Sequence, residues 1–132
     1  MTAPARQVLA GREREAVPEA AFIAARAAEA KLGNKTVVLA MGEFLGVTDA
    51  FVLTSGRNSR QVRTLSDEIE RQVKEETGRA PFGVEGLRDL QWVLIDYGDF
   101  VVHVFHEETR DYYDLERLWG NAPRVDWDAA GL

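Results

Sequence analysis

The chain has 132 residues, of which 45% are hydrophobic and 29% are charged, so it is long and apolar enough for one globular domain with its own core. Its formal net charge of −6 disfavours direct binding to nucleic acid, and the absence of cysteine excludes disulfides and thiolate metal sites. No apolar run approaches the roughly 20 residues of a membrane span, and the first residues lack the apolar core of a secretory signal, so we expect a cytoplasmic protein.

The N-terminal half is predicted to contain a leader, a helix and two buried strands. Residues 1–17 are small and polar, with alternating arginine and glutamate, and are expected to form a flexible leader. An alanine-rich run over 18–32 places its apolar residues on one side, which predicts a helix that ends at Gly33 and Asn34. Short apolar runs rich in β-branched residues predict strands over 36–41 and 50–55.

A long amphipathic helix is predicted next. Gly56 to Asn58 break the preceding strand, and Ser59 is a residue type that caps helices. Apolar side chains recur at helical spacing as far as Thr77, and Gly78 is expected to end the helix. The stripe that faces the core is expected to consist of Val62, Leu65, Ile69 and Val73.

The following segment has the pattern of a short edge strand and a β-hairpin. Residues 81–86 contain two apolar residues after a proline, which is typical of an edge strand. Residues 91–96 and 100–106 are predicted strands, and Tyr97 and Gly98 are expected to form a two-residue turn between them.

A last helix is expected to begin near Thr109 and to stop at Gly120. Its apolar face would consist of Tyr112, Leu115, Leu118 and Trp119. The element order α-β-β-α-β-β-β-α predicts an α+β fold, that is, a two-layer α/β domain over residues 18–123. A mixed β-sheet would carry its three helices on one face, and residues 124–132 would form a loose tail.

Side chains alternate across a strand, so the two faces of the predicted hairpin can be separated. The purely aliphatic face is the natural seat for the helices, and it consists of Val93, Ile95, Val102 and Val104. The opposite face is mixed and would be free to bind a partner. It contains Trp92, Leu94, Asp96, Val101, His103 and Phe105.

Acidic residues are concentrated in the same part of the chain. Between Trp92 and Glu116 seven carboxylates accompany a single cation, Arg110, so this segment carries a charge of −6, equal to that of the whole chain. The carboxylates are Asp96, Asp99, Glu107, Glu108, Asp111, Asp114 and Glu116. Opposite charges steer association, so an acidic aromatic surface without recognisable catalytic groups indicates docking on a basic protein.

Several of these residues also have a purely structural interpretation. Trp92 can be a core residue, His103 a hydrogen-bonded structural histidine, and Tyr112 a packing residue of its helix. A metal site is disfavoured because alternation sends His103 and His106 to opposite faces of the strand. The enzymatic alternative is nucleotidyl transfer, since the turn from Gly56 to Ser59 resembles a phosphate-binding turn, but the paired acids that would hold Mg²⁺ are missing.

Several segments in order resemble the ribosomal silencing factor family, RsfS, also called Iojap. The resemblance spans residues 18–123. The segments that carry it are Asp49–Gly56, Ser59–Val62, Glu85–Gly86, Trp92–Leu94, Asp96–Asp99, Val101–Phe105, Tyr112–Trp119 and Ala122–Pro123. The resemblance implies a fold related to the nucleotidyltransferases but without their activity, and it implies neither a cofactor nor a metal.

The resemblance also implies a function. Members of the family bind large-subunit ribosomal protein fourteen and sterically block joining of the ribosomal subunits, which represses translation. It implies partner contacts at Trp92, Asp96, Tyr97, Asp99, His103, Phe105 and Tyr112. It further suggests that the free protein forms a homodimer through the same surface.

Overall fold

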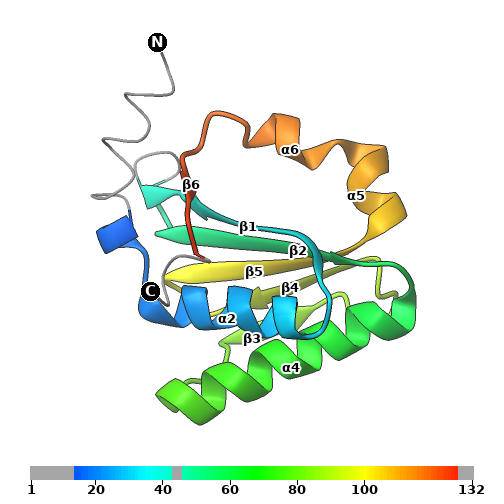
Figure 1. Cartoon of the computed structure of the whole chain (residues 1–132), viewed down its shortest axis with the longest axis horizontal. Coiled ribbons are helices and arrows are strands. Elements are labelled where there is room, and N and C mark those ends of the chain that lie inside the picture. The colour runs from blue at the N-terminus through cyan, green and yellow to red at the C-terminus, as the bar shows by residue number, and fades with distance from the viewer. Residues whose placement is uncertain (1–13, 43–45, 128–132) are drawn as a thin grey trace.

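The computed structural model describes residues 14–42 and 46–127, and of these the side chains of Leu115 and Glu116 are not described. The elements, which keep their labels in Figure 1, form one sheet with helices on both sides. They are α2 (Glu19–Ala30), β1 (Asn34–Ala40), β2 (Ala50–Gly56), α4 (Ser59–Thr77), β3 (Gly83–Glu85), β4 (Trp92–Asp96), β5 (Phe100–His106), α5 (Glu107–Tyr113), α6 (Leu115–Leu118) and β6 (Arg124–Val125).

The sheet is mixed, with the strand order β3-β4-β5-β2-β1-β6. β2 and β5 are parallel neighbours at its centre, and the other pairs are antiparallel. The predicted mixed α+β sheet is therefore confirmed. The short strand β3 lies at one edge, as the proline and weak apolar pattern of residues 81–86 predict.

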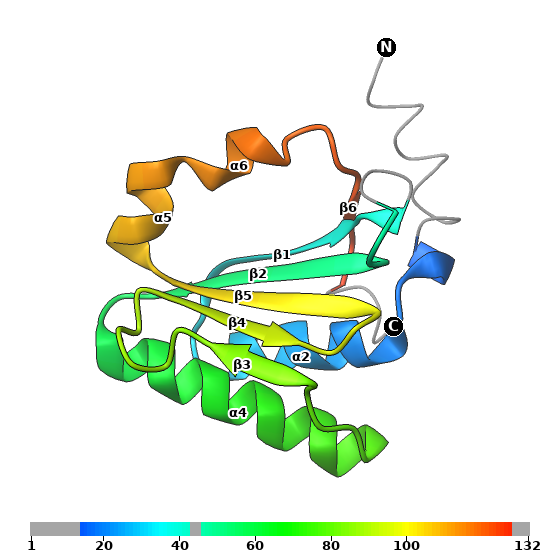
Figure 2. The same cartoon turned by 180° about the vertical axis from the view of Figure 1, so that it is seen from behind.

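Helices α2 and α4 cover one face of the sheet (Figures 1 and 2). The predicted stripe of α4 is confirmed, since Val62, Leu65, Ile69 and Val73 are all fully buried. The aliphatic face of the hairpin, from Val93 to Val104, lies in the same core cluster. Alternation along the strands thus assigned correctly the face that α2 and α4 cover.

The last helix differs from its prediction in shape and in place. Asp114 adopts φ 50°, in the left-handed region, and divides the expected helix into α5 and α6. Both lie over the face opposite to α2 and α4 (Figure 2). Trp119 packs there against Phe51, whereas Tyr112 and Leu118 are exposed, so the expected apolar face is wrong for these two residues.

Both ends of the described chain pack against the domain. Val17 is buried and the Arg14 guanidinium lies 4.5 Å from the centre of the Phe22 ring, so the leader expected over 1–17 is too long. The tail expected to be loose from residue 124 begins with β6, which pairs with β1, and the Trp127 indole donates a hydrogen bond of 3.0 Å to the carbonyl of Thr36. A two-residue strand is too short to show any periodicity in the sequence. Residues 1–13 and 128–132 lie outside the described part.

The N-cap of α4 is Asn58, not the expected Ser59. The backbone of Asn58 is extended and its side chain accepts a hydrogen bond from the amide of Gln61 at 2.9 Å. Asn58→Ala should lower the free energy of unfolding by about 1 kcal/mol, because an amide of the first turn loses its acceptor. Ser59→Ala is the matched control and should change it by less than about 0.5 kcal/mol. Urea unfolding of both variants checks this, and an equal loss in the two would contradict the assignment.

Candidate docking surface

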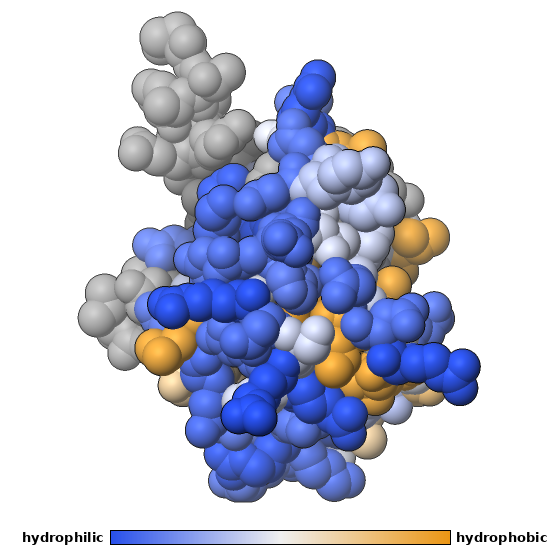
Figure 3. Space-filling model, turned by 90° about the vertical axis from the view of Figure 1, so that its right-hand side faces the viewer, coloured by the Kyte–Doolittle hydropathy of each residue, from blue (hydrophilic) through white to orange (hydrophobic). Residues whose placement is uncertain are grey.

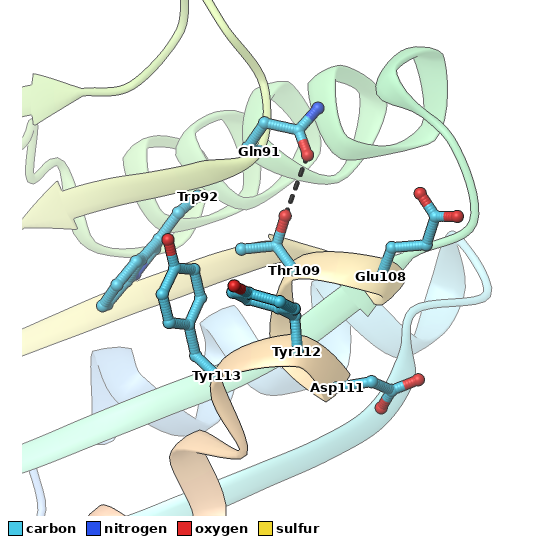
Figure 4. A pocket seen from close by; sticks show the side chains of 7 residues that line it. All are labelled: Gln91, Trp92, Glu108, Thr109, Asp111, Tyr112 and Tyr113. Carbon is cyan, nitrogen blue, oxygen red and sulfur yellow. Dashed lines mark hydrogen bonds between the residues drawn. The ribbon is translucent and has the colours of Figure 1, made fainter.

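An open groove of about 890 Å³ lies between the start of β4 and α5, and we call it the α5 groove. Figure 4 shows the side chains that line it. They are Gln91, Trp92, Glu108, Thr109, Asp111, Tyr112 and Tyr113. The hydroxyl of Thr109 donates a hydrogen bond of 2.8 Å to Oε1 of Gln91, which joins the two walls. The groove therefore combines three aromatic rings with two carboxylates.

The two tyrosines of the α5 groove point away from the core. Tyr112 is 80% exposed and Tyr113 is 59% exposed, and their rings meet edge to face at 5.0 Å. Asp111 is in a long contact of 3.7 Å with Lys35 on the surface. Figure 3 looks onto the end of the molecule at which α5 and α4 begin, and this end is mostly hydrophilic. Exposed aromatic rings in such polar surroundings are typical of protein interfaces.

Trp92 forms the inner wall of the groove and is half-buried. Its ring lies 5.1 Å from Phe105, and its indole N–H donates a hydrogen bond of 3.1 Å to Nδ1 of His103. Trp92 thus satisfies its one polar group inside the protein while part of the ring still faces the groove.

His103 is almost fully enclosed, at 4% exposure. Its ring lies 4.5 Å from Phe51 and 5.3 Å from Trp119, in a cluster of rings between the sheet and α6. Burial lowers the pKa of His103 to about 4, so the imidazole is neutral near pH 7. Because Nδ1 accepts the indole proton, the ring proton is on Nε2, and Nε2 has no hydrogen-bond partner among the described residues.

Arg110 fixes α5 to the sheet. Its side chain is 2% exposed, and Nη1 donates a hydrogen bond of 2.7 Å to the hydroxyl of Ser55 and reaches the carbonyl of Asn34 at 3.5 Å. The guanidinium also lies 5.8 Å from the centre of the Phe105 ring. In the sequence-based prediction Arg110 was only one charge of an acidic segment. A single cation among so many carboxylates was the feature of the sequence from which its structural role could have been predicted.

The comparisons with known proteins agree on one family. The family described as "Ribosomal silencing factor during starvation", RsfS, matches residues 14–131. The chain belongs to the RsfS family. It is 42% identical over 106 residues to the ribosomal silencing factor RsfS of Bacillus subtilis (strain 168), a match that covers 80% of this chain and 89% of that protein.

Two further relatives extend the RsfS comparison. A crystal structure of a protein from Chromobacterium violaceum superimposes with a TM-score of 0.72 and 34% identity, covering 77% of this chain and 84% of that one. The mouse protein named "Mitochondrial assembly of ribosomal large subunit protein 1" is 34% identical over 74 residues, which cover 54% of this chain and 32% of that protein. The expected resemblance to RsfS and Iojap proteins is therefore confirmed.

The structure separates the residues expected to contact a partner into accessible and buried ones. Trp92, Asp96, Asp99 and Tyr112 keep accessible side chains. Tyr97, His103 and Phe105 are at most 4% exposed, so the contact role expected for their side chains is corrected to one in packing. Two of these four residues, Trp92 and Tyr112, line the α5 groove, whereas Asp96 ends β4 at its far end and Asp99 lies in the turn that follows.

The burial of Tyr97 follows from alternation. Tyr97 continues the series of Val93 and Ile95 and therefore points to the side of α2 and α4, where it stacks on Phe100 at 4.6 Å. Burial raises the pKa of Tyr97 to about 12, with a smaller contribution from the carboxylate of Glu70. Tyr97 was predicted as a turn residue, whereas alternation extended by one residue beyond β4 predicts its burial.

The turn between β4 and β5 is held by acidic side chains. Its centre is Gly98 and Asp99, not Tyr97 and Gly98, because the amide of Tyr97 bonds the carbonyl of Phe100 at 3.0 Å. Gly98 has φ 89°, and the carboxylate of Asp96 accepts a bond of 2.8 Å from its amide. Asp99 forms an ion pair of 2.7 Å with Arg79. These contacts give Asp96 and Asp99 a local structural role, whether or not a partner also touches them.

The loop that resembled a phosphate-binding turn is occupied by bonds within the chain. The amide of Arg57 donates to Oε1 of Gln61 at 2.8 Å, and the amide of Gln61 donates to Asn58. A Cβ on Gly56 would lie 3.0 Å from the amide of Val62, so close packing against α4 accounts for the glycine.

Over residues 14–42 and 46–127 no group of three His, Cys, Asp or Glu side chains is arranged to hold a metal ion. No helix in the same ranges is long and apolar enough to cross a membrane.

Proposed function

We propose that this protein binds the large ribosomal subunit through ribosomal protein fourteen and sterically blocks joining of the two subunits, which represses translation in the cytoplasm. Membership of the RsfS family supports the ribosomal role. The contact with ribosomal protein fourteen and the block of subunit joining come from the family resemblance. The observation that carries the proposal is the α5 groove, in which exposed aromatic rings stand beside carboxylates.

The chemistry of the groove favours a protein partner with basic side chains. Trp and Tyr are enriched among the few residues that dominate the binding energy of interfaces, and a cation gains from both a ring face and a carboxylate. The net charge of −6 would repel the phosphate backbone of ribosomal RNA, so direct nucleic-acid contact is not the main interaction. The groove gives the chain a binding role that needs no catalytic group and no cofactor.

Subunit joining is the direct test of the proposed function. Separated large and small subunits are mixed with and without the protein and analysed by sucrose-gradient sedimentation. We expect the protein to sediment with the large subunit and to reduce the fraction of joined ribosomes. Binding to isolated ribosomal protein fourteen, measured by calorimetry, tests the contact itself. Full joining in the presence of excess protein would refute the steric mechanism.

Substitutions in the α5 groove test whether it is the docking surface. Trp92→Ala should weaken binding to the large subunit about 30-fold or more, because loss of an interface anchor costs about 2 kcal/mol. Phe82 is an equally suitable aromatic control, since it is 84% exposed and does not line the groove. Phe82→Ala should leave binding unchanged. Equal binding by the two variants would exclude the groove as the contact surface.

A homodimer of the free protein is part of the same proposal. Tyr112, Tyr113 and Leu118 expose apolar surface on α5 and α6, and a second copy could cover it. Self-association through this surface would compete with the ribosome. Sedimentation velocity of the free protein and of Tyr112→Ala measures it, and an unchanged dimer in the variant would place the dimer interface elsewhere.

A further inference from the structure

We propose that His103 is a positioning residue for docking, whose Nδ1 fixes the indole of Trp92 in the orientation that the α5 groove presents to the partner. The proposal rests on the proposed function. In this proposal His103 affects docking only through Trp92, because the imidazole itself is too deeply buried to touch another molecule.

Aromatic rings pack around the imidazole of His103, and the indole of Trp92 makes one hydrogen bond to it. Phe51, Trp119 and Phe105 surround the His103 ring, with centroid distances of 4.5, 5.3 and 6.0 Å. The indole N–H of Trp92 meets Nδ1 at 3.1 Å. An indole has a single donor, so this bond sets how the ring is turned about its attachment to β4. A fixed aromatic anchor loses less conformational freedom on binding than a mobile one.

A role in packing alone does not explain a histidine at this position. Its Nε2 is buried and has no hydrogen-bond partner among the described residues, which costs stability that an apolar ring would not lose. Phenylalanine would fill a similar space between Phe51 and Trp119, but it would leave the Trp92 N–H without its acceptor. The acceptor is therefore the property that distinguishes histidine from an apolar residue here.

Three substitutions separate the acceptor from the packing. In His103→Asn, Oδ1 stands the same number of bonds from the backbone as Nδ1 and can accept the indole proton. In His103→Gln, the amide extends toward the place of Nε2 instead. In His103→Phe, the ring is kept and the acceptor is lost. We expect His103→Phe to be the most stable of the variants and His103→Asn to be less stable than the wild type, because it buries an additional amide.

Two measurements are made on the full chain and these variants. The first is the NMR resonance of the Trp92 indole N–H, assigned with Trp92→Phe. It should stay near the wild-type position in His103→Asn and move upfield in His103→Gln and His103→Phe. The second is affinity for isolated large ribosomal subunits, under conditions in which all variants are folded. It should remain near wild type in His103→Asn and fall about tenfold in the other two, the effect expected of one lost hydrogen bond.

Each outcome bears on the proposal. Affinity that follows the indole resonance, and not stability, supports positioning. Wild-type affinity in His103→Phe with a displaced resonance refutes positioning and leaves the proposed function intact. An unmoved resonance in His103→Phe refutes the hydrogen bond itself. If wild-type protein does not bind the large subunit at all, the proposed function fails, and the docking role of His103 falls with it.

Discussion

Arg110→Ala should lower the free energy of unfolding by about 3 kcal/mol and detach α5 from the sheet, the largest effect of a single substitution that we expect. The change removes a side chain that is 2% exposed, together with its bonds to Ser55 and to the carbonyl of Asn34. It leaves a cavity and two polar groups without their donor. Alanine is the best helix former, so the loss would come from the missing contacts and not from helix propensity.

Arg117→Ala is the matched control for Arg110→Ala. Arg117 lies in α6, its side chain is 85% exposed, and it makes an ion pair of 3.7 Å with Asp114. Exposed pairs of this kind contribute about 0–1 kcal/mol, so the control should unfold almost like the wild type. Urea unfolding measures stability, and hydrogen exchange of the amides of α5 shows whether that helix opens separately. Similar losses in both variants would contradict the anchoring role of Arg110.

The consequence for binding follows from where α5 carries its side chains. Tyr112 and Tyr113 are on this helix, and Trp92 is on β4, so the α5 groove exists only while the helix stays against the sheet. Arg110→Ala should therefore weaken binding to the large subunit as strongly as Trp92→Ala, although Arg110 does not touch the groove. Normal binding by the variant would show that the partner does not require a fixed α5.

The sequence predicts the sheet and the face that α2 and α4 cover because both depend on short-range periodicity. The stripe of α4 and the alternation of β4 and β5 are regular over five residues or more, and the side chains that they assign to the face under α2 and α4 are buried. The break at Asp114 was not predictable in this way. It depends on one residue in a left-handed conformation, and the apolar spacing of residues 112–119 fits an unbroken helix equally well.

The candidate site was predictable in part. Trp92 follows from strand alternation and Tyr112 from the family resemblance, and the structure brings both to the same groove. Alternation also puts His103 and Phe105 on the same face as Trp92. It does not reveal that a later segment folds back over this face and places Trp119 against His103. Burial of a sheet face by a later segment is a tertiary property, so a sequence pattern defines the face and not its exposure.

Lowering the pH from 7 to 5 should destabilise the protein by about 2 kcal/mol through His103 alone. Burial lowers the pKa of His103 in the folded protein to about 4, against 6.5 for an unperturbed histidine. Between these two values the unfolded chain binds a proton that the folded chain excludes, so acid favours unfolding. Stability should therefore fall as the pH drops below 6.5, by about 3 kcal/mol in total at pH 4.

His103→Phe removes this titration and should make stability much flatter between pH 7 and 5. The carboxyl of Glu68 contributes little to the pH dependence of stability between pH 7 and 5. Hydrogen bonds from Arg71 and Gln72 lower its pKa to about 2, so its contribution is lost only as the pH falls below about 4.5. Urea unfolding at pH 5, 6 and 7 measures the difference between the two proteins. If the free energy of unfolding changes with pH equally in wild type and His103→Phe, the imidazole is not held neutral in the folded state. A histidine that is buried and neutral takes up its proton only when the chain unfolds, and this uptake is what makes stability fall with pH.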